Sequence, residues 1–415
     1  MLARITEDGM STDGFSSLAK KITKFAVLGS SLALLATSAA CGSSPTSTPT
    51  SPAPTTGTEN PGPSTSITAN AADDVVPCSN FHTGYAGDEQ CIAPPPADKG
   101  FQFHYGPSDY NDPAEVAKYT LPAHQEVTDC VYFPTPNDKD VYFNEYHSRM
   151  RPGSHHLLLY IQSAALPETG KAGPGQCSLA GQLQTTNLFG AQTATLDVKG
   201  LGNDAAENAG MAVLIPAKQQ GIMQVHFINA GTKPILREAW ANVLYVDKSQ
   251  VTQLSAPIFF IAGAGMNVAK GQTTVIHGAA TVPDTAGPDF RLIAATPHYH
   301  THTSRFTVTA TIGGETKTIL DNFPTMHVLP EPALVAYDSV EKNPVPNETA
   351  RVDGAFSGVL AMKPGDKIDW TCTVTNDDQP NPITFGNAVY TGEMCNLFGM
   401  YAPTIDGTAW SAPNP

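Results

Sequence analysis

The chain has 415 residues, 41% of them apolar, and a formal net charge of −15 at pH 7. This length accommodates two domains of ordinary size, and the acidic balance argues against nucleic acid as a partner, because phosphate binding requires clustered Lys and Arg. Glycine and proline number 35 each and are spread along the chain. Such usage is typical of many short strands joined by turns and disfavours long helices.

The N-terminus predicts an export signal peptide over residues 1–40. A lysine-rich region precedes an apolar segment, 25–36, that is too short to span a bilayer. Small residues then lead to Cys41, an arrangement similar to a bacterial lipobox, although Ser38 stands where such sequences usually carry Leu. We expect Cys41 to be lipidated, which makes the membrane a partner only through this anchor; ordinary cleavage and secretion is the alternative. A start at Met10 would give a more usual signal length.

Residues 41–73 consist largely of Ser, Thr, Pro and Gly. Such a segment cannot bury enough apolar surface to order itself, so it predicts a flexible tether. Beyond it, short apolar or alternating runs separated by Gly, Pro, Asn and Asp predict strands at 155–161, 211–215, 222–228, 243–246, 258–262, 291–295 and 306–312. The pattern predicts an all-β fold of antiparallel β-sandwiches. We place the boundary after the run 258–262, which gives domains 74–262 and 263–415.

Six cysteines follow Cys41: Cys78, Cys91, Cys130, Cys177, Cys372 and Cys395. An even number in an exported chain predicts three disulfides. None has the close C-x-x-C spacing of a zinc site, so metal ligation by thiolate is the weaker interpretation. Counting leaves the connectivity open, and their order along the chain favours pairing each cysteine with its neighbour.

Six of the twelve histidines fall in three strand-like segments. They are the adjacent His155 and His156, His226, and the alternating His298, His300 and His302. Residues two apart on a strand share a face, so neighbours within the alternating group can close on one metal ion. Consecutive residues point to opposite faces, so the adjacent pair can share an ion only if the strand twists or bulges. We interpret the other six histidines as surface or core residues.

A methionine bears on which metal these imidazoles would bind, since copper, zinc, iron and nickel all accept imidazole. Met394 stands beside Cys395, and a site that adds a thioether to imidazole favours Cu(I) over hard cations. A single methionine is more often core filler. By itself, Met394 is therefore a weak candidate for a ligand.

Four segments resemble, in order, motifs of the family of peptidylglycine α-hydroxylating and dopamine β-monooxygenases. They are 154–160 (SHHLLLY), 224–227 (QVHF), 298–302 (HYHTH) and 393–397 (EMCNL). The resemblance covers about residues 115–403 and implies two tandem jelly-roll-like antiparallel β-sandwich domains with one copper ion each. It also implies an oxidoreductase, a copper-dependent monooxygenase that uses dioxygen and a reductant such as ascorbate to hydroxylate a C–H bond of a small molecule.

The resemblance assigns three ligands to the first, electron-transferring copper: His155, His156 and His226. The second, catalytic copper would take Met394 with two of the three alternating histidines. His300 with His302 matches the His-Thr-His of the animal enzymes, whereas His298 with His300 matches the Thr-Pro-His-x-His of bacterial relatives. We favour His298 with His300 and keep the other pair as an alternative. The resemblance also implies two disulfides that support the ligands: Cys130–Cys177 beside the first ligand set and Cys372–Cys395 beside the second.

The substrate-binding residues of the family are only partly present. Asn396 is kept, but the arginine that holds a peptide carboxylate is replaced by Thr296 or His298, depending on the register, and a tyrosine is replaced by Phe398. Without that arginine a carboxylate lacks a bidentate partner, so we expect a non-peptide substrate. The alternative functions are a non-enzymatic copper-binding or copper-delivery lipoprotein and an adhesive surface lipoprotein. In each case the folded part would face the periplasm or the cell exterior.

Overall fold

A computed structural model describes residues 75–163, 175–177, 186–202, 209–322, 356–405 and 410. The expected signal peptide, the tether and Cys41 lie outside these residues. The described part is built mainly of strands, with a single seven-residue α-helix, α1 (Pro113–Tyr119), and three short 3-10 segments: η1 (Asp88–Gln90), η2 (Gly200–Gly202) and η4 (Lys248–Gln250). No helix in these ranges is long and apolar enough to cross a membrane.

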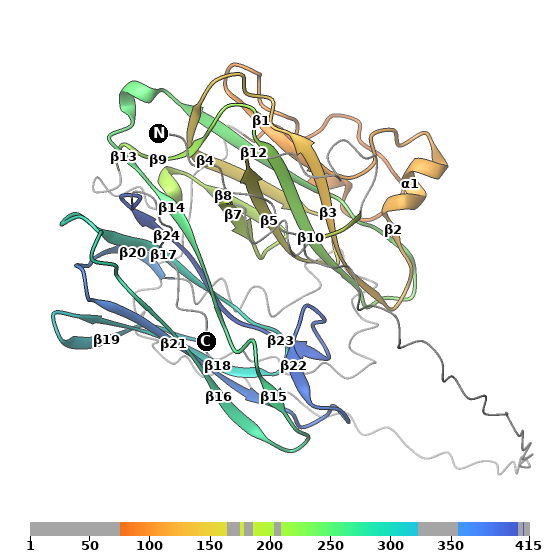
Figure 1. Cartoon of the computed structure of the whole chain (residues 1–415). Helices are drawn as coiled ribbons and strands as arrows, with labels where there is room; N and C mark the ends of the chain where they lie inside the picture. Colours follow the sequence, from red (N-terminus) through yellow and green to blue (C-terminus); the bar gives the residue numbers. More distant parts are fainter. Residues whose placement is uncertain are drawn as a thin grey trace, which may run out of the picture. The chain divides into compact units, whose positions relative to one another are not determined.

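The first sandwich consists of two facing antiparallel sheets (Figure 1). One has the order β1 (Gly100–Tyr105), β12 (Ala239–Val246), β4 (Val141–Met150), β9 (Met211–Ile215), with β8 (Thr195–Val198) also on β4 and the short β13 (Gln253–Leu254) parallel to β9. The other has the order β6 (Gly175–Gln176), β3 (Gln125–Pro134), β10 (Gln220–Asn229), β5 (Ser154–Gln162), β7 (Thr186–Ala191). A small ladder joins β2 (Thr120–Leu121) to β11 (Ile235–Leu236).

The second sandwich has the same two-layer plan. One sheet runs β14 (Ala256–Ala262), β24 (Cys395–Ala402), β17 (Arg291–His298), β20 (Phe356–Ala361). Its partner runs β16 (Thr273–Thr281), β21 (Lys367–Thr375), β18 (Thr303–Ile312), β19 (Glu315–Asn322). A third ladder joins β15 (Asn267–Val268), β22 (Ile383–Phe385) and β23 (Gly392–Glu393). The all-β prediction of jelly-roll-like sandwiches is confirmed, and each of the seven runs predicted as strands lies within a strand.

The burial of β5 explains its unbroken apolar sequence. All nine of its residues are buried, because both faces of the strand are covered. Leu157 and Leu159 point into the core of the first sandwich, whereas Leu158 and Tyr160 pack in a second cluster that includes Phe398 of β24. A strand covered on both faces shows a continuous apolar run in place of alternation. The outer face of this sheet is therefore the face that contacts the second sandwich.

The boundary between the sandwiches differs from the prediction. The apolar run 258–262 was expected to close the first domain, but β14 pairs with β24 along its whole length, Ala256 opposite Tyr401 and Ala262 opposite Cys395 (Figure 1). The chain changes sandwich at Ser255, directly after β13. The error has a physical reason: an apolar run predicts a strand, and its composition does not say with which sheet it pairs.

Three disulfides join neighbouring cysteines in the order expected. Cys78–Cys91, Cys130–Cys177 and Cys372–Cys395 have Cα–Cα separations of 5.4, 5.0 and 5.9 Å. The prediction of three bridges is confirmed. The third joins β21 to the start of β24 and so ties together the two layers of the second sandwich.

The buried side chain of Arg151 connects residues that precede β1 to the first sandwich through ion pairs. The guanidinium of Arg151 donates to Glu238 at 2.7 Å and to Asp88 at 2.8 Å, and it packs against the ring of Trp240. Burial alone would raise the pKa of Asp88, but hydrogen bonds from Thr83 and Arg151 hold it below its ordinary value. This ion pair therefore stabilises the folded chain most when the carboxyl is ionised.

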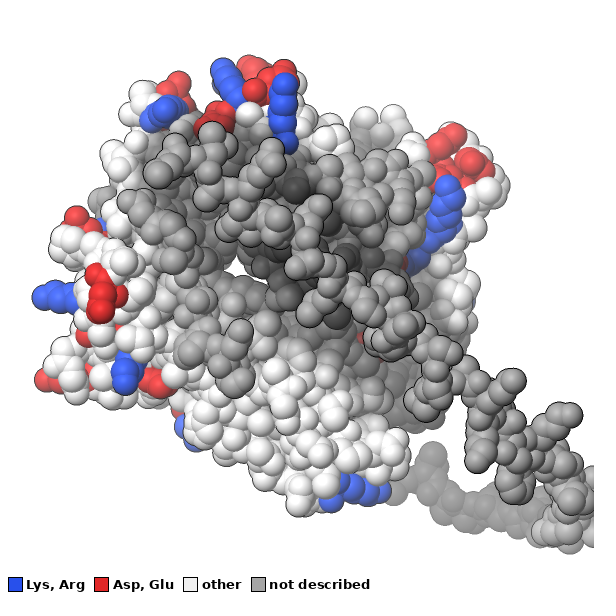
Figure 2. All heavy atoms as spheres, in the orientation of Figure 1, with Lys and Arg blue, Asp and Glu red and all other residues white. Residues whose placement is uncertain are grey.

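Surface charges of the two signs are interspersed. On the face that Figure 2 shows, blue Lys and Arg side chains lie beside red Asp and Glu side chains at several places along the described surface. Pairs such as Lys118 with Glu115, at 2.6 Å, and Arg305 with Asp321, at 2.8 Å, are examples of this mixing. Exposed pairs of this kind contribute about 0–1 kcal/mol each, so they bear on solubility more than on the fold.

Candidate metal centre

A β-bulge brings His155 and His156 to one side of their strand. In the ladder between β10 and β5, His226 lies opposite His156, but the next residue, Phe227, lies opposite Ser154. His155 is thus the extra residue of the bulge. An extra residue bends the strand and re-aims its side chain, which is the condition under which adjacent histidines can share a metal ion.

Five histidines converge next to this bulge, three from the first sandwich and two from the second. The ring of His155 lies 5.1 Å from His156 and 4.9 Å from His226, measured between ring centroids. It also lies 5.5 Å from His298, the last residue of β17, and 5.3 Å from His300 in the turn that follows. All five rings are buried, with 1 to 6% of their surface exposed. We call this group the five-histidine cluster.

The cluster contains two overlapping sets of possible metal ligands. One nitrogen from each of His155, His156 and His226 lies within 4.8 Å of the others, and the same holds for His155, His298 and His300. Imidazole–metal bonds of about 2.0–2.1 Å, as for zinc, place nitrogens on one tetrahedral ion about 3.4 Å apart. Each set can therefore close on an ion by side-chain shifts of roughly 1 Å, and both fit a metal that accepts imidazole.

Hydrogen bonds fix which nitrogen of two of these rings carries the proton. His226 Nε2 lies 2.7 Å from a carboxylate oxygen of Glu126 on β3. His298 Nδ1 lies 2.8 Å from Oε1 of Gln192, whose amide nitrogen donates to the Pro297 carbonyl at 3.0 Å. Because both partners are acceptors, each of these ring nitrogens must donate, and the other nitrogen keeps the lone pair that binds a metal. Acceptors placed in this way orient metal-binding histidines in known sites.

These same acceptors join the two sandwiches. Gln192 follows β7 of the first sandwich and holds two consecutive residues, Pro297 and His298, of the second. Glu126 accepts from His226 and also, at 2.8 Å, from the backbone N–H of Val389 in the second sandwich. Each acceptor thus ties a ring of the cluster to the contact between the sandwiches.

A buried carboxylate shapes the turn that carries His300. Glu393 is fully buried and accepts hydrogen bonds from the backbone N–H groups of His300, His302 and Met394, the last at 2.8 Å. Burial raises the pKa of Glu393 to about 7, although these backbone donors and Thr303 act in the opposite direction. The carboxylate thereby connects the turn after β17 to the start of β24.

His302 lies apart from the five-histidine cluster. Its Nε2 donates to the Tyr390 carbonyl at 2.9 Å, and its Nδ1 lies 3.7 Å from a carboxylate oxygen of Asp378. It belongs to neither ligand set found among the described residues. Of the two registers considered from the sequence, the structure brings together His298 and His300.

Met394 and Asn396 flank this second ligand set. Asn396 lies opposite His298 in the ladder between β17 and β24, and its amide nitrogen donates to the sulfur of Met394 at 3.4 Å. The ring of Phe398, two residues further along β24, lies 5.0 Å from that of His298. The sulfur of Met394 is therefore hydrogen-bonded to Asn396, the residue that lies opposite His298. Met394 as a whole residue is half-buried.

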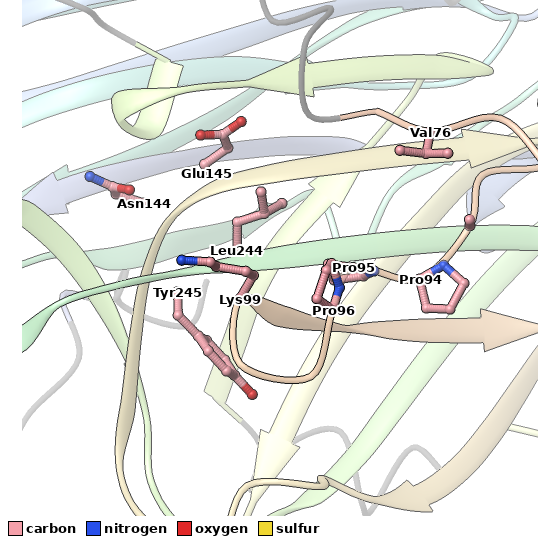
Figure 3. Close-up of a pocket in the computed structure, with 10 residues that line it drawn as sticks. Val76, Pro94, Pro95, Pro96, Lys99, Asn144, Glu145, Leu244 and Tyr245 are labelled. Carbon is pink, nitrogen blue, oxygen red and sulfur yellow. The ribbon is translucent and has the colours of Figure 1, made fainter.

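A separate pocket lies on the first sandwich, away from the cluster. Its volume is about 440 Å³, and Figure 3 shows Pro94, Pro95 and Pro96 on one side and Asn144 and Glu145 on the other. None of the five clustered histidines lines it. Its walls combine proline rings with polar groups.

Sequence reasoning missed the acceptors Gln192, Glu126 and Glu393. Glu393 directly precedes Met394 and Cys395, and this position beside an expected ligand is the one signal that the sequence offered. For Gln192 and Glu126 the sequence gives no such signal, since polar residues at strand ends are common.

Comparison with known proteins identifies no family. No protein-family profile and no curated protein matches the sequence. Among solved structures, the chain is similar to PNGase F, a glycosylasparaginase from Flavobacterium meningosepticum, with 8% identity over 72% of this chain and 94% of that one, and a TM-score of 0.29. It is also similar to the STIV MCP, with 11% identity over 73% of this chain and 97% of that one, and a TM-score of 0.26. These likenesses carry no argument about function.

Proposed function

We propose that the protein is a copper-dependent monooxygenase that hydroxylates a C–H bond of a small, non-peptide molecule. The observation that carries the proposal is the five-histidine cluster, in which buried imidazoles from both sandwiches form two overlapping ligand sets. Neutral imidazoles in a buried site suit copper, and the neighbouring thioether of Met394 favours its reduced form. Among the residues described, His155, His156 and His226 would hold one copper, and His298 and His300 with Met394 the other.

Bound copper would supply redox chemistry in which one oxygen atom of dioxygen enters a C–H bond and the other leaves as water, with two electrons and two protons from a reductant such as ascorbate. The protein's own groups position the ligands. Glu126 and Gln192 hold the protons of His226 and His298 on the nitrogens that face away from the ion. Tight burial of all five rings keeps bulk water from the ligand nitrogens.

The carboxamide of Asn396 offers a contact for substrate. It is 1% exposed, and its Oδ1 has no hydrogen-bond partner among the described residues, while its amide nitrogen donates to Met394. A buried acceptor without a partner costs about 1–3 kcal/mol. A substrate hydroxyl or N–H group beside Met394 would satisfy it, which supports a neutral, hydrogen-bond-donating substrate.

Oxygen consumption with a matched pair of variants tests the proposal. Copper-loaded protein is given ascorbate and a panel of small neutral molecules, and dioxygen uptake is compared with hydroxylated product. Met394→Ile should abolish substrate-dependent uptake, whereas Met362→Ile, a change at a methionine buried in the core of the second sandwich, should leave it intact. Oxidation of ascorbate with no dependence on any substrate in the panel contradicts the proposal.

The near-complete burial of the cluster favours a second candidate, a copper-binding or copper-delivery protein. Rings with 1 to 6% exposure retain an ion well and leave little room for a substrate. Such a protein would bind Cu(I) tightly, and Met394→Ile would weaken binding without any oxygen chemistry to lose. The oxygen-uptake experiment separates the two candidates, because only the enzyme couples uptake to a product.

We also propose that the protein is exported and lies outside the cytoplasm, anchored through Cys41. The three disulfides support export, since such bridges persist in oxidising compartments. The lipid anchor itself rests on the sequence around Cys41. The anchor is tested by growing cells that produce the protein with a radioactive fatty acid. The purified protein should carry the label, and a Cys41→Ser variant should not.

A further inference from the structure

His155 occupies a special place among the five clustered histidines. Its ring lies within 5.5 Å of four others, at centroid separations of 4.9 to 5.5 Å. It is also the one residue that belongs to both ligand sets. The bulge between β5 and β10 places it there, and the turn after β17 brings His298 and His300 to it.

A neutral imidazole presents one lone pair, because its second nitrogen carries a proton. His155 can therefore ligate one metal ion at a time. While it completes the set with His156 and His226, the set with His298 and His300 lacks its third imidazole, and the reverse also holds. The two sets compete for one shared ligand.

We propose that the five histidines form a single metal centre with His155 as the common ligand, so that the folded chain binds one Cu(I) ion tightly and a second one far more weakly. The proposal rests on the metal binding of the proposed function and changes its stoichiometry: two copper ions per chain that are each held by three imidazoles are incompatible with this arrangement, and a second ion would be left with His298, His300 and the thioether of Met394. In the set that includes His298 and His300 the ion takes ligands from both sandwiches and so ties them together.

The shared ligand predicts an asymmetry among single substitutions. His155→Ala breaks both sets and should weaken the tight site roughly 100-fold or more, because loss of a supporting partner alone costs roughly 10–100-fold. His156→Ala leaves the set of His155, His298 and His300 complete, and His298→Ala leaves the set of His155, His156 and His226 complete. Each should keep one tight equivalent with an affinity within about 10-fold of the unchanged chain.

The experiment is anaerobic titration of the metal-free mature protein with Cu(I) in competition with a chromophoric Cu(I) chelator. The unchanged chain should hold one tight equivalent, with three imidazoles per copper by X-ray absorption. His302→Ala is the matched control, since His302 is equally buried and belongs to neither set. Thermal unfolding of each metal-free variant shows whether it is folded.

Each outcome bears on a different claim. Two equivalents of equal affinity in the unchanged chain overturn the shared-ligand proposal and leave the proposed function standing. This result needs no variant, so a misfolded His155→Ala chain does not remove the test. No Cu(I) binding at all overturns the proposed function itself. Equal losses of affinity in His155→Ala and His156→Ala also contradict the shared role of His155.

Discussion

Replacing Gln192 by leucine should weaken the contact between the sandwiches and the binding of copper at the ligand set that contains His298. Gln192 is 6% exposed. It donates to the Pro297 carbonyl at 3.0 Å and accepts from His298 Nδ1 at 2.8 Å. Leucine has a similar volume but neither donor nor acceptor, so the change leaves two buried polar groups without these partners.

The size of the effect follows from those two groups. A buried donor or acceptor left unsatisfied costs about 1–3 kcal/mol, and the added apolar burial of leucine offsets part of the sum. We expect the unfolding free energy of the metal-free protein to fall by about 2–4 kcal/mol. In a His156→Ala background, which leaves only the set of His155, His298 and His300 complete, loss of the acceptor that orients His298 should lower the Cu(I) affinity by roughly 10–100-fold.

Gln102→Leu is the matched control. Gln102 on β1 also makes two hydrogen bonds from its amide, to the Ile92 carbonyl at 2.8 Å and to Asn242 at 2.9 Å, but it touches none of the clustered histidines. Urea unfolding should show a comparable loss of stability in both variants, and Cu(I) competition in the His156→Ala background should show a loss of affinity only with Gln192→Leu. Equal Cu(I) affinities in the two variants would refute the reasoning that Gln192 orients His298.

Three further changes have defined outcomes. In a His298→Ala background, which leaves only the set of His155, His156 and His226 complete, Glu126→Leu removes the acceptor of His226 and should lower Cu(I) affinity by roughly 10–100-fold. An unchanged affinity in competition titration speaks against that set. Asp88→Asn should cost the same stability at all pH values well above 3.8, the ordinary pKa of this carboxyl. Its folded-state pKa is lowered, so the difference should shrink as the pH falls through that lower value, and a difference that grows in acid, measured by urea unfolding, contradicts the assignment. Replacing both Cys372 and Cys395 by alanine should lower the unfolding free energy by about 2–4 kcal/mol, and a loss below 1 kcal/mol in urea would show that the bridge adds little.

Seven of the strands in the described part of the chain were predictable, because each contains a short apolar or alternating run bounded by turn-forming residues. The run 211–215 coincides with β9, and 155–161 and 222–228 lie within β5 and β10. The disulfides followed from their order along the chain. The partner of an apolar strand was not predictable, since β14 is equally apolar whichever sheet it joins, and this moved the boundary to Ser255.

The candidate site was predictable in part. The sequence indicated that His155 and His156 could share an ion only if the strand twisted or bulged or one ring reached round, and the ladder between β5 and β10 has a bulge at this point. It could not show that His155 also meets His298 and His300, because these residues are more than a hundred positions apart and meet only through packing of one sandwich on the other. For the same reason it could not assign Gln192 a role.

The most direct test of the central claim is metal analysis combined with electron paramagnetic resonance of the exported protein after copper loading in air. We expect bound copper with a type II Cu(II) spectrum that carries hyperfine coupling to imidazole nitrogen. This signal should be lost or strongly altered in His155→Ala and kept in His302→Ala. Protein that retains zinc and excludes copper, or copper that binds with no nitrogen coupling, contradicts the account.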